Sequence, residues 1–153
     1  MAATPHVIED YVRWSDVDLA GILCYGSYLR FFEIAETELF RAAGLAHRDG
    51  FERFGIWFPR ASLHIDFYEP ARLDDRLRVA AYIARVGNKS LTVNFDMSRE
   101  DRSSLSATGH EVLVCVERGN LQSRPIPPEV IKSLSPYTLG ADAARAALGV
   151  DAP

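Results

Sequence analysis

Residues 26–44, GSYLRFFEIAETELFRAAG, have helical periodicity and an apolar surface too wide for one flat neighbour to cover. The positions that recur every three or four residues are Leu29, Phe32, Ala35 or Glu36, Leu39 and Ala43. Phe31, Ile34 and Phe40 widen this surface. We assign Glu33, Glu36 and Glu38 to a solvated stripe, Ser27 to the N-cap and Gly44 to the C-terminal stop. A helix of this kind has to be wrapped by the rest of the chain.

After this helix the period of the sequence changes to two, which is typical of β-strands. Strands are predicted at residues 7–14, 60–68, 77–86, 90–98 and 105–119. Within 60–68, one face is predicted to carry Ala61, Leu63, Ile65 and Phe67, and the opposite face Arg60, Ser62, His64 and Asp66. Gly87-Asn88 predicts a hairpin turn, and Gly109 is expected to interrupt the last strand.

One long helix and about five mostly antiparallel strands predict an α+β fold with a curved sheet around a central helix. The chain of 153 residues is short enough for a single domain, which we place at residues 1–135. Prolines after Gly119 exclude a further central strand, and a short helix is expected near residues 129–134. The tail, 136–153, is rich in small residues and is interpreted as either a loosely docked helix or a frayed end.

Charge and hydropathy exclude several functional classes. A formal net charge of −4 argues against a general binder of nucleic acid or anionic membranes. No apolar stretch approaches the roughly 18 residues that a membrane span needs, and the first residues lack the pattern of a secretory leader. We therefore expect a cytoplasmic protein in which Cys24 and Cys115 are not paired.

Familiar catalytic motifs are missing. The G-x-S-x-G nucleophile elbow of serine hydrolases is absent, since Ser27 lies in YGSYL. The four histidines are scattered without metal-ligand spacing. Neither of the glycine motifs that bind phosphate groups, G-x-x-x-x-G-K-[ST] and G-x-G-x-x-G, occurs. Cys24 has no identifiable histidine partner and is interpreted as a buried thiol. The sequence accordingly predicts no metal and no cofactor.

The stretch WSDVDLAGILCYGSY, residues 14–28, combines two acids with a glycine and a helix start. Asp16 is placed to hold the loop, and Asp18 lies two residues further on, ahead of Gly21. Unpaired backbone amides at a helix start can polarise a carbonyl and bind an oxyanion. A carboxylate facing that carbonyl could attack it or activate a water. The same two acids could equally be turn-forming and capping residues, and composition alone leaves both interpretations open.

The segment DVDLAGILCYGSYLRFFE resembles the signature of hotdog-fold acyl-CoA thioesterases of the 4-hydroxybenzoyl-CoA thioesterase type, a group that includes the Tol-Pal-associated thioesterases. The similarity continues through YEPARLDDRL, VGNKSL and EVLVCV, over roughly residues 7–130. It implies a five-stranded antiparallel sheet wrapped around one long helix. It also implies homodimers or homotetramers with sites at the subunit interface, and an acyl-CoA or acyl-carrier-protein substrate.

The resemblance further implies roles for individual residues. Asp18 falls where the family keeps its catalytic nucleophile or general base, and Asp16 and Gly21 shape its loop. Tyr25 and Gly26 supply the backbone amides that bind the thioester oxygen, although the Tol-Pal-associated branch has a histidine in place of Tyr25. Residues expected to bind substrate or CoA are Tyr28, Arg60, Lys89 and Ser90.

Three functions are compatible with this resemblance. The first is hydrolysis of an acyl-CoA with a short-chain or aromatic acyl group. The second is a hotdog domain that binds acyl thioesters without cleaving them, which the presence of Asp18 argues against. The third is a dehydratase or hydratase, whose chemistry usually needs a histidine near the helix start. No histidine lies there, so thioester hydrolysis is favoured.

Overall fold

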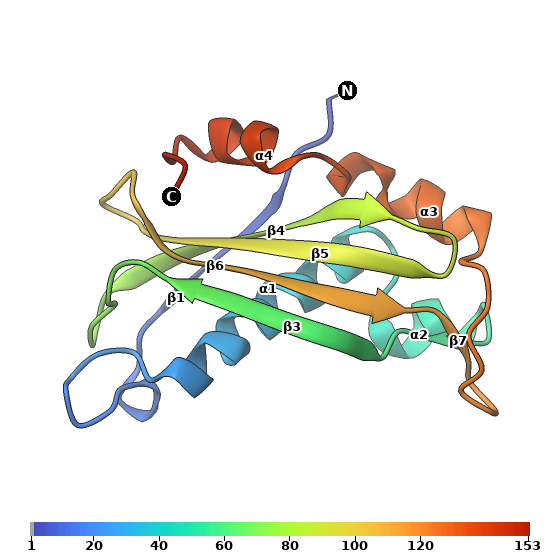
Figure 1. Cartoon of the computed structure of the whole chain (residues 1–153), viewed down its shortest axis with the longest axis horizontal. Coiled ribbons are helices and arrows are strands. Elements are labelled where there is room, and N and C mark those ends of the chain that lie inside the picture. Colours follow the sequence, from blue (N-terminus) through green and yellow to red (C-terminus); the bar gives the residue numbers. More distant parts are fainter. Residues whose placement is uncertain (1) are drawn as a thin grey trace.

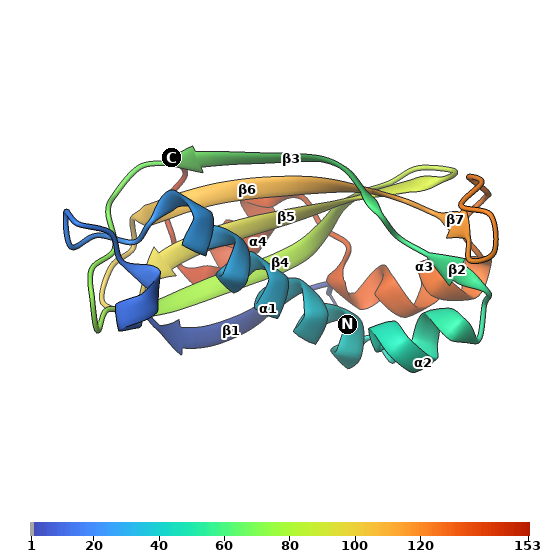
Figure 2. The same cartoon turned by 90° about the horizontal axis from the view of Figure 1, so that it is seen from below.

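The computed structural model describes residues 2–153 and contains a five-stranded antiparallel sheet. Its strands are β1 (His6–Tyr11), β3 (Arg60–Phe67), β4 (Arg76–Val86), β5 (Ser90–Arg99) and β6 (Leu105–Val114). The strand order is β1-β4-β5-β6-β3, so β1 and β3 are the edges (Figure 1). The long helix α1 (Tyr28–Ala42) lies along one face of this sheet (Figure 2). The predicted α+β hotdog architecture is confirmed.

Shorter elements surround this frame. They are two 3-10 turns (Trp14–Asp16 and Tyr25–Ser27), α2 (His47–Glu52), β2 (Ile56–Trp57), β7 (Val116–Glu117), α3 (Pro128–Leu134), a 3-10 turn (Ser135–Tyr137) and α4 (Ala141–Leu148). The first strand ends at Tyr11, and the predicted last strand divides because β7 leaves the main sheet to pair with β2. The short helix expected near 129–134 is α3. Among residues 2–153 no helix is long and apolar enough to cross a bilayer.

The buried face of α1 forms the centre of the core. Phe31, Phe32, Ala35, Leu39 and Phe40 are fully buried. The ring of Phe32 stacks on that of Phe95 in β5, with 4.6 Å between their centroids. Gly44 has a φ of 75° just after α1, as expected of a glycine that ends a helix.

Two side chains lie on the opposite side from the one predicted. Glu36 is only 1% exposed and does not belong to the solvated stripe. Arg60 was expected opposite Leu63, yet both line the same cavity beside α1. A register shift between Arg60 and Ser62 explains this, because one extra residue in β3 reverses the alternation of side chains. Arg60 can then donate a hydrogen bond to Glu36 over 2.5 Å.

Gly109 does not interrupt β6, which continues through it. A Cβ at this position would lie 2.6 Å from Cε2 of Phe32 and 3.1 Å from the backbone oxygen of His64. The glycine therefore allows the ring of Phe32 to pack directly on the strand. Close packing, and not a break in pairing, is the reason for a glycine here.

Replacing Gly109 by alanine is expected to destabilise the protein by about 1–3 kcal/mol, because the new methyl group overlaps a fully buried ring that is stacked on Phe95. Thermal unfolding measures the effect. The double variant Gly109→Ala/Phe32→Leu should lose less stability than the two single changes added together. Strict additivity of the two changes would contradict this account of Gly109.

The C-terminal tail contains a helix that contacts the outer face of the sheet. Arg145 of α4 pairs with the buried carboxylate of Asp96 in β5 at 3.1 Å, and Ala144 is fully buried. The hydroxyl of Tyr82 donates a second hydrogen bond to Asp96 over 2.9 Å. The outer face of the sheet is thus partly covered by the chain itself.

Candidate functional site

The loop before α1 is a small turn that presents Asp18. The amide of Gly21 donates to the carbonyl of Asp18 at 3.0 Å, and the amide of Asp18 donates to the carbonyl of Ile22 at 3.0 Å. Gly21 has a φ of 74°, which a residue with a side chain rarely adopts. Oδ1 of Asp18 accepts a hydrogen bond from the amide of Ala20 at 2.8 Å. Within residues 2–153, Oδ2 of Asp18 has no hydrogen-bond partner, so this oxygen remains available to a ligand.

The start of the helix offers unpaired amides. Tyr25 and Gly26 open the 3-10 turn that leads into α1, so their N–H groups have no preceding turn of helix to bond to. Ser27 holds the predicted N-cap position, but its side chain makes no capping hydrogen bond, because its backbone is already helical. The amide of Ser27 donates to the carbonyl of Cys24 at 2.8 Å. The positive end of α1 is therefore open at Tyr25 and Gly26.

Asp18 and the helix start meet at one cavity of about 420 Å³. Its lining consists of Asp18, Ile22, Leu23, Tyr25, Tyr28, Phe67, Tyr68, Glu69 and Pro70. Tyr28 is buried, and its ring contacts that of Phe67 edge-on at 4.9 Å. Burial raises the pKa of Tyr28, so its hydroxyl stays protonated. The cavity combines the carboxylates of Asp18 and Glu69, aromatic walls and the unpaired amide of Tyr25.

Asp16 is buried in an ion pair that joins its loop to α1. Arg30 donates to both carboxylate oxygens of Asp16, at 2.9 and 2.5 Å, and to Asp10 at 3.0 Å. The amide of Arg13 adds a hydrogen bond to Asp16 at 2.8 Å. Burial alone would raise the pKa of Asp16, but the hydrogen bonds from Arg30 and Arg13 outweigh it and lower this pKa. This geometry suits the loop-holding role expected of Asp16.

The other predicted ligand residues lie at the far end of the sheet. Arg60 begins β3, whereas Phe67 of the Asp18 cavity ends it, about 23 Å away at 3.3 Å per residue. Lys89 and Ser90 lie at the β4–β5 turn, where Ser90 pairs with Val114 (Figure 1). Within one chain, the structure therefore brings Asp18, Tyr25 and Tyr28 to one cavity, with Gly26 next to Tyr25 in the 3-10 turn. It leaves Arg60, Lys89 and Ser90 apart from them.

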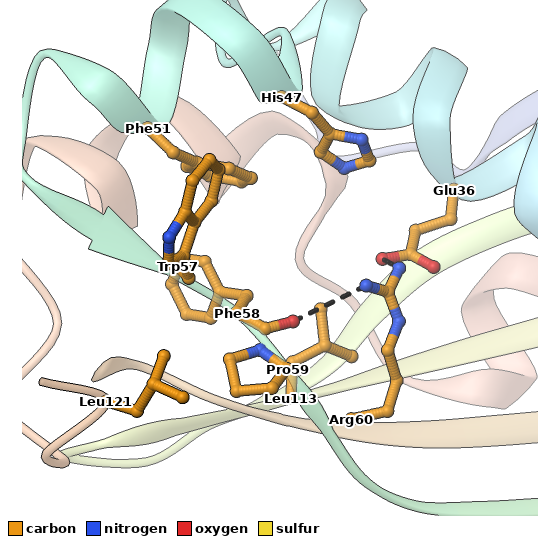
Figure 3. A pocket seen from close by; sticks show the side chains of 9 residues that line it. All are labelled: Glu36, His47, Phe51, Trp57, Phe58, Pro59, Arg60, Leu113 and Leu121. Atoms are coloured by element: carbon orange, nitrogen blue, oxygen red, sulfur yellow. Dashed lines mark hydrogen bonds and ion pairs between the residues drawn. The ribbon is translucent and has the colours of Figure 1, made fainter. Parts of the chain in front are cut away.

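A second group of titratable side chains surrounds Arg60. Besides its contact with Glu36, Arg60 approaches Oε2 of Glu111 with its Nε at 3.5 Å. Figure 3 shows Glu36 and Arg60 on one side of a cavity of about 390 Å³, with the rings of Phe51, Trp57 and Phe58 on the other. His47 also lines this cavity, and burial lowers its pKa. Burial and the charge of Glu36 raise the pKa of Glu111 to about 7, in spite of Arg60.

The pKa of Glu111 implies a particular pH dependence of stability. A carboxyl whose pKa is raised on folding binds a proton more tightly in the folded state, so its contribution to stability falls as pH rises from about 4.5 to about 7. Glu111→Gln removes the ionisable group and with it this loss of stability at high pH. We expect the difference in Tm between variant and wild type to favour the variant more at pH 8 than at pH 5. An equal difference at both pH values would contradict the assignment.

No pattern in the sequence places Glu36, Glu111 and His47 in one group. Glu36 lies one helical turn after Phe32. Glu111 shares with Gly109 and Leu113 the face of β6 that points toward α1. The sequence signal that could have revealed these two acids is their position within the apolar repeats of α1 and β6. Arg60 alone was singled out, on the strength of the resemblance.

Comparison with known proteins agrees with this architecture. Residues 12–134 match the thioesterase-like superfamily. The chain is 29% identical over 119 residues to the acyl-CoA thioesterase YbgC of Haemophilus influenzae, covering 78% of this chain and 86% of that protein. It is 28% identical over 128 residues to the 1,4-dihydroxy-2-naphthoyl-CoA hydrolase of Thermosynechococcus vestitus, covering 80% and 86%.

Solved structures show the same fold. A 1,4-dihydroxy-2-naphthoyl-CoA thioesterase from Synechocystis superposes with a TM-score of 0.77 at 21% identity, over 85% of this chain and 95% of that one. Because the superfamily match covers most of the residues and the fold agrees with it, the chain belongs to the thioesterase-like superfamily.

Proposed function

We propose that this protein is a thioester hydrolase that cleaves an acyl-CoA to the free acid and CoA. The observation that carries the proposal is the cavity in which Asp18, with one unbonded carboxylate oxygen, meets the open start of α1. Relatives named as acyl-CoA thioesterase and 1,4-dihydroxy-2-naphthoyl-CoA hydrolase support the same activity.

In the proposed mechanism the thioester carbonyl points its oxygen at the amides of Tyr25 and Gly26. These amides and the positive end of α1 stabilise the negative charge that develops on the oxygen. Asp18 attacks the carbonyl carbon to give a mixed anhydride, which water then hydrolyses to the free acid and Asp18, or it removes a proton from a water that attacks the carbonyl directly. The CoA sulfur leaves as a thiolate, which needs no strong acid because thiols have a pKa of about 8.5.

We propose that two copies of the chain complete each site. β3 is an edge strand whose apolar residues Leu63 and Phe67 are 45% and 53% exposed. Antiparallel pairing of two β3 edges about a point between Leu63 and His64 would place Arg60 of one copy opposite Phe67 of the other. Lys89 and Ser90 of the copy that contributes Arg60 would then be near enough to bind the CoA portion of the substrate. Light scattering should detect at least a dimer, and a fully active monomer would contradict the shared site.

A panel of acyl-CoA thioesters, short-chain and aromatic, tests the activity through release of free thiol. Hydrolysis of at least one member well above the uncatalysed rate is expected. Tight binding of the panel without any thiol release would instead indicate a domain that binds thioesters without cleaving them.

A further inference from the structure

We propose that two copies of the chain together form a zinc site from His64 and His110 of each copy. The site lies on the outer face of the sheet, on the side away from α1 and the Asp18 cavity. The inference rests on the β3–β3 pairing proposed above, and the hydrolysis itself does not use the ion. Three features support the site: two paired rings in each chain, an open face and the two-fold symmetry of the pairing.

His64 and His110 are directly paired residues of neighbouring strands. His64 in β3 is opposite His110 in β6, and the two ring centroids lie 5.2 Å apart with 21° between the ring planes. Both side chains are exposed. Oδ1 of Asp66 lies 3.0 Å from Nε2 of His64. A carboxylate at one ring nitrogen is the usual partner of a metal-binding histidine, and it leaves the other nitrogen, Nδ1, to the ion.

The two rings project from the outer face of the sheet. Leu63 lines a cavity beside α1 and Ile65 packs against the core, so His64 between them points the other way. Gly109 packs against α1, so its neighbour His110 also points away from that helix. The helix α4 reaches this face at β4 and β5 and lies away from β3 (Figure 1). The rings therefore stay open to solvent.

One chain alone offers too few ligands for a zinc ion. Among residues 2–153, no group of three or more His, Cys, Asp or Glu side chains is placed to hold a metal. The two imidazoles would fill only half of the four positions of a tetrahedral zinc ion. A second copy of the chain has to supply the other half.

The proposed pairing of two β3 edges supplies these ligands. Its two-fold axis passes next to His64, at the centre of β3, so the His64 residues of the two copies lie on adjacent strands about 4.8 Å apart. A two-fold axis perpendicular to the sheet keeps the outer faces of both copies on one side. Four imidazoles then form a row across the seam, with the two His64 rings in the middle and a His110 ring at each end. Zinc prefers such nitrogen ligands, and a structural zinc site needs no open position.

Spacing along the chain gave no sign of this site. Strand pairing brings His64 and His110 together, and pairing of two copies doubles their number. Because the dimer alone holds all four ligands, an ion bound there stabilises the dimer by mass action.

Calorimetric titration of the chelator-treated protein with Zn²⁺ near neutral pH tests the inference. We expect one ion to bind for every two chains, with a Kd on the order of 1 μM. Mg²⁺ should not bind, since it prefers oxygen ligands. Light scattering over a dilution series measures the effect on assembly. When free zinc is about 100 times its Kd, the dissociation constant of the dimer should fall about 100-fold.

Four variants isolate the ligands. His64→Gln keeps a polar side chain and removes the two central rings, so it should abolish zinc binding and the effect of zinc on the dimer. His110→Gln should weaken zinc binding as well. Asp66→Asn removes the carboxylate next to His64 and should lower the affinity for zinc about 10–100-fold. His6→Gln, in the opposite edge strand β1, is the matched control and should bind zinc like wild type.

Absence of zinc binding in wild type would overturn the inference, as would zinc binding that survives His64→Gln or that takes one ion per chain. The outcomes also separate this site from the proposed function. A dimer that hydrolyses thioesters but binds no zinc refutes only the metal site. A chain that stays monomeric with and without zinc refutes the β3 pairing itself.

Discussion

Asp18→Asn is expected to lower kcat for acyl-CoA hydrolysis by about 10²–10⁴-fold while leaving Tm unchanged. The amide of asparagine cannot act as a nucleophile or remove a proton from water. Its side-chain oxygen can still accept the hydrogen bond that Asp18 Oδ1 receives from the amide of Ala20, so the turn is preserved. The measurement is thiol release at saturating substrate, alongside thermal unfolding of both proteins.

The other acid lining this cavity provides an internal comparison. Oε2 of Glu69 already accepts a hydrogen bond from Ser104 at 3.0 Å, whereas Oδ2 of Asp18 is unbonded. We therefore expect Glu69→Gln to reduce kcat far less than Asp18→Asn does. Near-normal turnover of Asp18→Asn would show that Asp18 is not catalytic. If Glu69→Gln were then the inactive variant, Glu69 would take over the role.

Asp16→Ala is expected to lower stability and activity together. It removes the buried carboxylate that Arg30 contacts through two nitrogens, and it leaves the guanidinium only partly paired through Asp10. Breaking a buried ion pair from one side typically costs about 3–5 kcal/mol. Because Arg30 is 32% exposed, water offsets part of this, and we expect about 2–3 kcal/mol. Denaturant unfolding and thiol release measure the two losses.

The effect of Asp16→Ala should depend on pH. Hydrogen bonds from Arg30 and Arg13 overcome the opposing effect of burial and lower the pKa of Asp16 in the folded state. A lowered pKa contributes stability that is present above the unfolded value, about 3.9, and is lost as pH falls through the folded value. The gap between wild type and variant should therefore be full at pH 7 and should narrow below about pH 4. A selective loss of kcat without any change in stability would instead make Asp16 catalytic.

Arg30→Met distinguishes a loop-holding pair from a direct chemical role of Asp16. Arg30 lies outside the lining of the Asp18 cavity, so its effect on turnover must pass through the loop. If the pair only holds the loop, Arg30→Met should reproduce the combined loss of stability and activity seen in Asp16→Ala. Full activity in Arg30→Met together with inactivity in Asp16→Ala would contradict this account.

Local sequence patterns were sufficient for the frame of the fold. The repeat through Phe32, Ala35 and Leu39 predicted α1, because only a helix brings residues at this spacing to one face. Alternation in residues 77–86 and 90–98 predicted β4 and β5 for the corresponding reason. These elements are long and strongly periodic, so each is specified by its own residues. The acids of the Asp18 loop were also visible in the sequence, and the position of Asp16 suggested that it holds the loop, but the choice of Asp18 as the catalytic acid came from the family resemblance.

Features that depend on contacts between distant segments could not be predicted in this way. The direction of the Arg60 side chain depends on a one-residue bulge of β3 against β6. The need for a glycine at position 109 depends on the ring of Phe32, which packs directly on the strand there.

The sequence by itself determined the order of helix and strands and placed an acid beside a helix start, because these follow from short-range periodicity and local turn chemistry. Only the tertiary structure decided that Asp18, Phe67 and Tyr25 at the helix start border one cavity, and that Glu36, Arg60 and Glu111 gather at the opposite end of β3. Burial and charge at those places arise from segments far apart in the chain, and no local pattern encodes them.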